Sequence, residues 1–311
     1  MQQLSNMNPL KKKVIKALNK LPYIRGLHQE NLQFKENAFF PAGHFYSPII
    51  NVAEIRNREN EIWEKGSVDG IAGINLHTAK QIELLNSLSS WYEGMPFRAE
   101  KQPGLRYYFE NTYYTYTDGI ILYAMLRQFK PKRIIEVGSG FSSALMLDTN
   151  ELYFQNQVHL TFIEPYPERL NSLISESDKK NTTVIEKNVQ AVSPEIFKKL
   201  ERNDILFIDS THVVKTGSDV NHLLFEILPL LNPGVLIHFH DVFYPFEYPK
   251  DWVFKGWNWN EDYFLRAFLM YNEAFEIRMF AEYLHRHHPA VFNAMPLSYK
   301  NTGGNLWLEK K

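Results

Sequence analysis

The side chains of this chain best suited to chemistry are two aspartates and two histidines that follow apolar segments. Asp209 and His212 stand in the sequence IDSTH, and His240 and Asp241 end the sequence HFHD. An imidazole at position 212 could take a proton from a hydroxyl group near neutral pH. Asp209 and His212 are therefore our candidate catalytic residues. Two carboxylates brought together repel unless a cation separates them, and aspartate oxygens suit Mg²⁺ or Mn²⁺. The candidate metal ligands are Asp209, Asp241 and His240.

A second group of residues forms a glycine-containing turn between an apolar segment and a helical pattern. In the sequence EVGSGFS (136–142), two glycines permit a tight turn and the close approach of a ligand to the backbone. The helix that follows would direct its N-terminus at that ligand. A serine replaces the third glycine of a full dinucleotide-binding fingerprint, so half of that motif is present. The predicted cofactor-binding residues here are Glu136, Gly138, Ser139, Gly140 and Ser142.

Two further polar residues stand where the next apolar segments end. Glu164 follows Gly140 by 24 residues, close to the spacing at which an acidic side chain accepts hydrogen bonds from ribose hydroxyls. Asn188 follows the next segment, where side-chain and backbone groups could meet an adenine ring. Glu164, Asn188 and Asp209 complete the predicted cofactor site.

These residues need a scaffold that brings several strand ends to one edge, and residues 133–240 have such a pattern. Short apolar segments, typical of strands buried on both faces, alternate there with helical patterns. The alternation predicts βαβ units in a doubly wound, Rossmann-like α/β fold with a mostly parallel sheet, whose ligands bind at the carboxyl ends of the strands. Two late segments could form an antiparallel pair. The expected strands are 133–137, 158–164, 182–187, 204–209, 234–240, 275–280 and 305–310. The expected helices are 77–93, 117–129, 142–154, 167–177, 193–200, 217–231 and 260–272.

The first part of the chain has a different character. Residues 9–21 fit a short basic amphipathic helix, which could bind a membrane surface or a partner or lie on its own domain. Residues 31–60 are less regular, and the sequence FFPAGHFYSPI favours an ordered segment such as a lid, in which His44 could touch a substrate. An aromatic segment with three tryptophans follows Asp241, and we expect it to shape an acceptor pocket because aromatic rings stack on sugar rings.

Composition excludes several functions. The net charge of −1 provides no basic field to attract nucleic acid. The absence of cysteine excludes disulfides, thiolate nucleophiles and cysteine-ligated zinc. No run of 18 apolar residues is present, so we expect no transmembrane segment, and the N-terminal residues lack the apolar region of a secretory signal. We expect a cytoplasmic protein that acts on a small molecule, with a homo-oligomer left open.

Together, EVGSG, Glu164, IDSTH and HFHD resemble the class I S-adenosylmethionine-dependent methyltransferases. The D-x-x-H pattern of Asp209 and His212 is similar to the macrocin-type sugar O-methyltransferases. The resemblance covers about residues 105–311 and leaves 1–104 as a helical and irregular N-terminal extension. It implies a seven-stranded sheet with a reversed last strand and S-adenosylmethionine as cofactor. It also implies methylation of a hydroxyl on a sugar or glycosylated small molecule, with a divalent metal and a histidine base. His240 departs from that group, which has an acidic residue there.

Three other functions remain open on the sequence alone. A dehydrogenase using NAD or a nucleotide-sugar would need a complete G-x-G-x-x-G and a Tyr-x-x-x-Lys pair, which we do not find. An iron-dependent hydroxylase could use His212, His240 and Asp241 as a facial triad. A non-catalytic binding module would be favoured by loss of Asp209 or His212, but both are present.

Overall fold

The structure is a computed structural model that describes residues 9–18, 20–64 and 69–311. The chain divides into two compact units, Met1–Arg58 and Glu59–Lys311. Within the described residues, no helix is both long enough and apolar enough to cross a membrane.

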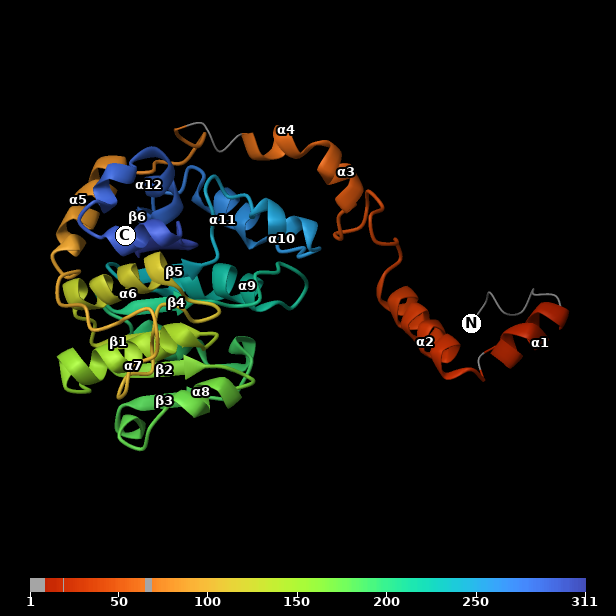
Figure 1. Cartoon of the computed structure of the whole chain (residues 1–311), viewed down its shortest axis with the longest axis horizontal. Helices are drawn as coiled ribbons and strands as arrows, with labels where there is room; N and C mark the ends of the chain where they lie inside the picture. The colour runs from red at the N-terminus through yellow and green to blue at the C-terminus, as the bar shows by residue number, and fades with distance from the viewer. Residues whose placement is uncertain (1–8, 19, 65–68) are drawn as a thin grey trace. The chain divides into compact units, whose positions relative to one another are not determined.

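In the part of the smaller unit that the structure describes, helices are joined by irregular segments (Figure 1). Helix α1 covers Pro9–Leu18, α2 covers Pro22–Asn37 and α3 covers Val52–Asn57. A proline at the first helical position begins α2, and Asn51 caps α3 by accepting hydrogen bonds from two backbone amides. The predicted helix over 9–21 includes residue 19, which lies outside the described residues. Irregular structure was expected from residue 31, but α2 continues to Asn37.

His44 lies in the irregular segment between α2 and α3. Its ring stacks on Phe40, with centroids 4.8 Å apart, and on Phe45, with centroids 4.4 Å apart. Its Nδ1 accepts a hydrogen bond of 3.1 Å from the amide of Tyr46. The FFPAGHFYSPI segment is therefore ordered by contacts among its own residues. Contact of His44 with a substrate stays a prediction.

The larger unit is built on a seven-stranded sheet with the order β3-β2-β1-β4-β5-β7-β6 (Figure 1). Strand β7 runs antiparallel to β5 and to β6, and the other pairs are parallel. The predicted seven strands, the mostly parallel sheet and the reversed last strand are confirmed. The strands are β1 (Arg133–Val137), β2 (His159–Ile163), β3 (Thr182–Ile185), β4 (Ile205–Ile208), β5 (Leu236–His240), β6 (Phe275–Phe280) and β7 (Asn305–Lys310).

The register of the sheet brings the predicted site residues to one edge. Val137 of β1 lies opposite Ile163 of β2 and Ile208 of β4. The residues that follow these three positions are therefore at the same level of the sheet. Because Ile208 lies opposite Phe239 of β5, His240 and Asp241 join the same edge.

Helices cover the sheet much as the sequence predicted. Three expected helices differ in detail. The helix expected over 167–177 ends at Leu173, and residues Pro194–Lys199 form a 3-10 helix. The helix expected over 217–231 begins as α9 (Asp219–His222) and continues as a π-helical turn, Leu223–Ile227, and a 3-10 turn, Leu228–Leu230. The change at Leu228–Leu230 follows from Pro229, which has no backbone N–H for a helical hydrogen bond. The α-helices of this unit are α4 (Glu59–Trp63), α5 (Thr78–Ser89), α6 (Tyr116–Phe129), α7 (Phe141–Phe154), α8 (Glu168–Leu173), α9 (Asp219–His222), α10 (Lys250–Phe254), α11 (Glu261–Leu269) and α12 (Ala281–His287).

Helix α5 belongs to the larger unit, although we expected it in an extension ending at residue 104. Leu85 and Leu88 are fully buried in the core of this unit. The amide group of Gln81 donates to the carbonyl of Leu76 and accepts from the amide of Phe280 at 2.7 Å. This side chain therefore connects α5 to the end of β6. The compact units divide after Arg58 because of such contacts, and a separate role for residues 1–104 stays a prediction.

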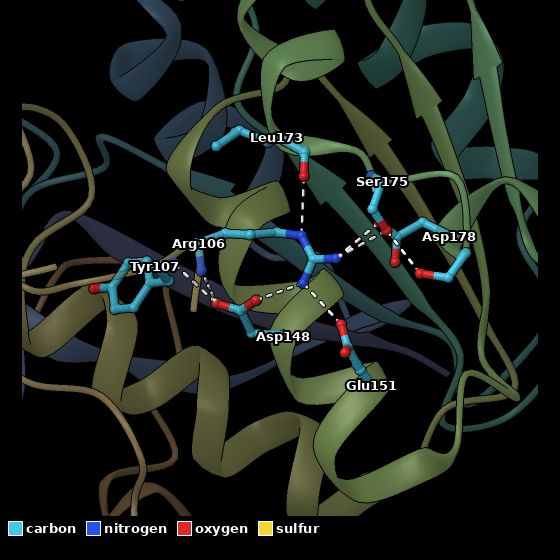
Figure 2. A network of polar contacts seen from close by, with 8 residues as sticks. Arg106, Tyr107, Asp148, Glu151, Leu173, Ser175 and Asp178 are labelled. Carbon is cyan, nitrogen blue, oxygen red and sulfur yellow. Dashed lines mark hydrogen bonds and ion pairs between the residues drawn. The ribbon is translucent and has the colours of Figure 1, made fainter. Parts of the chain in front are cut away.

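Arg106 fixes the segment that precedes α6 (Figure 2). Its guanidinium donates to Asp148 at 2.7 Å, to Asp178 at 2.8 Å and to the carbonyl of Leu173 at 2.9 Å. Asp148 in turn accepts from the backbone amides of Arg106 and Tyr107, both at 2.8 Å. The segment is thereby held against α7 and the end of α8, and it continues to the tyrosines of the site described next.

Candidate active site

The turn between β1 and α7 is held by buried hydrogen bonds. Gly138 has a φ of +81°, and a Cβ there would overlap the carbonyl oxygen of Asp209, so only glycine fits. Glu136 is fully buried and accepts hydrogen bonds from the hydroxyls of Ser142, at 2.5 Å, and Ser143. Burial raises the pKa of Glu136 to about 8, although both serine hydrogen bonds lower it. Glu136 therefore fixes the shape of the turn and lines neither of the two cavities described below.

A cavity of about 380 Å³ lies at the carboxyl ends of β1, β2 and β4. The predicted cofactor residues Gly138, Glu164, Asn188 and Asp209 line it. The Glu164 carboxylate accepts hydrogen bonds from the amides of Ser139, at 3.1 Å, and Tyr166, at 2.9 Å. These two bonds orient the carboxylate and leave further lone pairs for a ligand.

A second cavity, of about 310 Å³, lies on the other side of Asp209. The two cavities share Asp209, Ser210 and Thr211, so one elongated molecule could enter both. The predicted residues Ser139, Gly140, Ser142, His212, His240 and Asp241 line the second cavity. Sequence reasoning missed Tyr113, Tyr114, Phe141 and Arg169, which also line this cavity. Trp259, from the aromatic segment expected to shape an acceptor pocket, completes the wall.

His212 has acidic side chains near both of its ring nitrogens. Its Nδ1 lies 2.9 Å from Oε2 of Glu261, while its Nε2 lies 3.5 Å from Oδ1 of Asp209 and 3.7 Å from Oδ2 of Asp241. The ring is 4% exposed and packs on Trp259, with centroids 4.4 Å apart. The backbone at His212 has a φ of +59°, in the left-handed region that a non-glycine residue rarely adopts. Its Nε2 therefore faces the two aspartates.

Glu261 is a functional candidate that the sequence did not reveal. It begins α11, and its amide donates to the carbonyl of His212 at 3.2 Å. Its carboxylate is buried, and Oε1 has no hydrogen-bond partner among the described residues. An acidic residue in the first turn of a helix is common because it complements the helix dipole, so its position carried no special signal.

Opposing effects set the protonation of this cluster. Burial works to lower the pKa of His212, but the carboxylates of Asp209 and Glu261 outweigh it, and the pKa is well above the usual value. Burial works to raise the pKa of Asp209, but His240 and His212 outweigh it, and the pKa is lowered. Burial raises the pKa of Asp241. The raised pKa favours the protonated form of His212 beside these carboxylates.

Residues 135–242, which run from β1 to the end of β5, match the family model of a methyltransferase domain. The strand order with one reversed strand and the cavities at the strand ends agree with that match. The chain is a class I S-adenosylmethionine-dependent methyltransferase.

This methyltransferase is also similar to other proteins along more of its length. It is 30% identical over 197 residues to an uncharacterized protein of Archaeoglobus fulgidus, a match over 62% of this chain and 86% of that protein. Two solved structures resemble it distantly. One is a methyltransferase of Podospora anserina bound to S-adenosylhomocysteine, with 18% identity, a TM-score of 0.40 and coverage of 78% of this chain and 100% of that one. The other is the O-methyltransferase TomG of Streptomyces achromogenes in complex with S-adenosylmethionine, with 12% identity, a TM-score of 0.41 and coverage of 74% and 89%.

The predicted metal ligands of the methyltransferase lie close together but do not surround a site for a cation. The carboxylates of Asp209 and Asp241 converge on Nε2 of His212, and His240 Nε2 lies 3.5 Å from Oδ1 of Asp241. In the part of the chain that the structure describes, no group of three or more histidine, aspartate or glutamate side chains is arranged to hold a metal ion. The imidazole of His212 lies between the two carboxylates, where the prediction placed a metal.

The aromatic segment after Asp241 contributes one ring to the site. Trp259 lines the second cavity, and Trp257 packs behind it with ring centroids 4.8 Å apart. Trp252 in turn contacts Trp257, at 4.9 Å between centroids. The three indole rings therefore form a cluster, and Trp259 is the member that lines the cavity.

Proposed function

We propose that this methyltransferase transfers a methyl group to a hydroxyl oxygen of a small molecule, with His212 as the general base. The observation that carries the proposal is that His212 lines a cavity that shares Asp209, Ser210 and Thr211 with the cavity of Glu164. A base next to a cofactor cavity is the arrangement that deprotonation of an acceptor requires.

The first cavity is the proposed binding site of the adenosine part of the cofactor. Glu164 would accept hydrogen bonds from the ribose hydroxyls, and Asn188 lies where the adenine ring would extend. The remaining part of the cofactor would pass Gly138 and the turn residues toward the second cavity. Asp209 lines both cavities, and its lowered pKa keeps a negative charge at their junction. That charge would attract the sulfonium of the cofactor.

The bound cofactor supplies a methyl group already activated for displacement by an oxygen nucleophile. Nε2 of His212 would accept the proton that the acceptor hydroxyl loses as oxygen bonds to the methyl carbon. Glu261 would keep the proton of Nδ1, which leaves Nε2 as the basic nitrogen. Asp209 and Asp241 would stabilise the resulting imidazolium. Positioning can supply about 7–11 kcal/mol of the barrier, and base catalysis about 10²–10⁴-fold in rate.

Because the raised pKa of His212 favours the protonated ring, the base must form before transfer. A positive sulfonium near Asp209 would disfavour a second cation and lower the pKa of His212. Cofactor binding would thereby help to prepare the base.

A sugar or glycosylated small molecule is the proposed acceptor. Trp259 and the exposed ring of Tyr113 border the cavity and give its wall the aromatic surface that sugar rings contact in proteins. A divalent metal is not included in the mechanism because His212 lies between the carboxylates that would ligate it. A cytoplasmic location also stays a prediction.

Calorimetric titration with S-adenosylhomocysteine and with NAD tests the cofactor part of the proposal. We expect micromolar binding of S-adenosylhomocysteine and none of NAD; the reverse result would favour a dehydrogenase. Transfer of labelled methyl groups to a panel of hydroxylated and glycosylated small molecules tests the acceptor part. Methylation of amines only, with no hydroxyl accepted, would refute it.

A further inference from the structure

Arg169 extends from the first turn of α8 to the wall of the second cavity. Its guanidinium carbon lies 4.5 Å from the centroid of the Tyr113 ring. Its Nη1 also lies 3.6 Å from the point that a Cβ on Gly140 would occupy, so the side chain reaches over the turn between β1 and α7. The planar guanidinium is thus held between a tyrosine ring and the cofactor turn, at the side of the cavity formed by Tyr113 and Gly140.

The guanidinium of Arg169 has no carboxylate or carbonyl partner among the described residues, in contrast to Arg106. Its charge is nevertheless felt in the site, where it contributes to the lowered pKa of Asp209. A guanidinium presents several donors in a planar fork that matches a carboxylate. Arg169 therefore offers unused donors at a cavity wall.

Other polar groups of the same cavity also lack partners. Tyr114, Ser139 and Ser210 line the cavity, and their hydroxyls are buried without a hydrogen-bond partner within the described part of the chain. Buried polar groups without partners are uncommon in folded proteins, and several around one cavity indicate a polar ligand. These hydroxyls and Arg169 together leave a set of donors for an anionic group.

We propose that Arg169, supported by the ring of Tyr113, binds a carboxylate in the second cavity. This inference rests on the proposed function and adds that a molecule bound in the second cavity carries a carboxylate. The carboxylate could belong to the amino-acid end of the cofactor or to the acceptor. In either case the carboxylate would lie at Arg169. The reacting hydroxyl of the acceptor would lie at His212, beside Asp209 and Asp241.

The first experiment distinguishes the cofactor as the source. S-adenosylhomocysteine and methylthioadenosine share the adenosine and thioether, but only the former has a carboxylate. We compare their dissociation constants in the wild type and in Arg169→Met, which retains a long apolar side chain but removes the charge. If the cofactor supplies the carboxylate, S-adenosylhomocysteine should bind about 10- to 100-fold more weakly to the variant, and methylthioadenosine equally well.

The second experiment examines the acceptor as the source. With the protein saturated by S-adenosylhomocysteine, 3,4-dihydroxybenzoate and catechol are titrated as probes that differ by one carboxylate. If the acceptor supplies the carboxylate, the wild type should bind dihydroxybenzoate about tenfold or more tightly than catechol. Arg169→Met should lose this difference in affinity. Arg169→Lys, which keeps the charge without the fork, should restore part of either effect.

Arg127→Met is the matched control, because Arg127 also lies over a tyrosine ring, 3.7 Å from the centroid of Tyr153, but lines neither cavity. It should change none of these affinities. If Arg169→Met shifts the affinity of neither S-adenosylhomocysteine nor dihydroxybenzoate, the carboxylate site is refuted while the proposed function stands. A wild type that binds no S-adenosylhomocysteine would instead refute the proposed function.

Discussion

Two buried clusters of charge in the larger unit are built from the same kinds of groups but differ in how well those groups are paired. Around Arg106, hydrogen bonds of 2.7–3.0 Å reach two aspartates, a glutamate and a carbonyl (Figure 2). Around His212, Glu261 lies at 2.9 Å, and the two aspartates are 3.5 Å and 3.7 Å away beside a cavity. A paired cluster holds the chain together, whereas a loosely paired cluster at a cavity keeps groups that can exchange a proton.

Replacing His212 gives the largest expected effect on activity. In His212→Gln the side chain can still form hydrogen bonds but cannot accept a proton at neutral pH. We expect the rate of methyl transfer at saturating cofactor to fall about 10²–10⁴-fold, with the affinity for S-adenosylhomocysteine within a few-fold of wild type. Labelled methyl transfer and calorimetry measure the two quantities. A variant that retains more than a tenth of the activity would show that another group takes the proton.

Replacing Arg106 should have the opposite signature. In Arg106→Met the carboxylates of Asp148 and Asp178, whose side chains are almost completely buried, lose their cation. We expect the free energy of unfolding to fall by about 3–5 kcal/mol, as measured by urea denaturation. The folded variant should keep the wild-type rate of methyl transfer. A change in rate without loss of stability would remove the distinction between the two clusters.

The pH dependence separates the contribution of His212 to stability from its role as general base. Its pKa is raised in the folded protein, so its contribution to stability is present below the unfolded pKa of about 6.5 and is lost as the pH rises through the folded pKa. The rate should change in the opposite direction and increase over this range as Nε2 becomes free to accept a proton. Rate profiles and urea denaturation between pH 6 and 9 measure both trends.

Glu261→Gln sharpens this prediction. The variant keeps a hydrogen-bonding group at Nδ1 but removes one of the carboxylates that raise the pKa of His212. We expect the rising limb of the rate profile to move to lower pH and the maximal rate to fall about tenfold. Glu151→Gln, at the exposed edge of the Arg106 cluster, is the control and should leave the profile in place. An unmoved limb in Glu261→Gln would show that Glu261 does not set the basicity of His212.

The sequence predicted the sheet well because its strands are buried on both faces and bounded by turns, as in RIIEV and ILFI. The register then accounts for why Glu164, Asp209 and Asp241, far apart in the chain, lie at one edge. The other side of the site was not predictable in this way. Glu261 lies at the start of α11 and contacts His212, and Tyr113 lies in the segment before α6. Neither residue follows a strand. Both residues reach the site through packing between segments that are far apart in the chain. The spacing of residues along the sequence does not indicate such contacts.

Metal removal should have the smallest effect, and it tests whether His212 or a cation neutralises Asp209 and Asp241. The two carboxylates converge on the same imidazole nitrogen, so a cation between them would have to displace that ring from Glu261. We therefore expect methyl transfer after dialysis against EDTA to stay within about twofold of the untreated rate, because the protonated ring already compensates the paired carboxylates. Asp241→Asn serves as the comparison, since it removes one carboxylate without touching Glu261. Loss of activity in EDTA that Mg²⁺ or Mn²⁺ restores in the wild type, but not in Asp241→Asn, would mean that His212 moves aside for a metal. The cluster would then be a metal centre in its working state, with the ion pair as its resting arrangement.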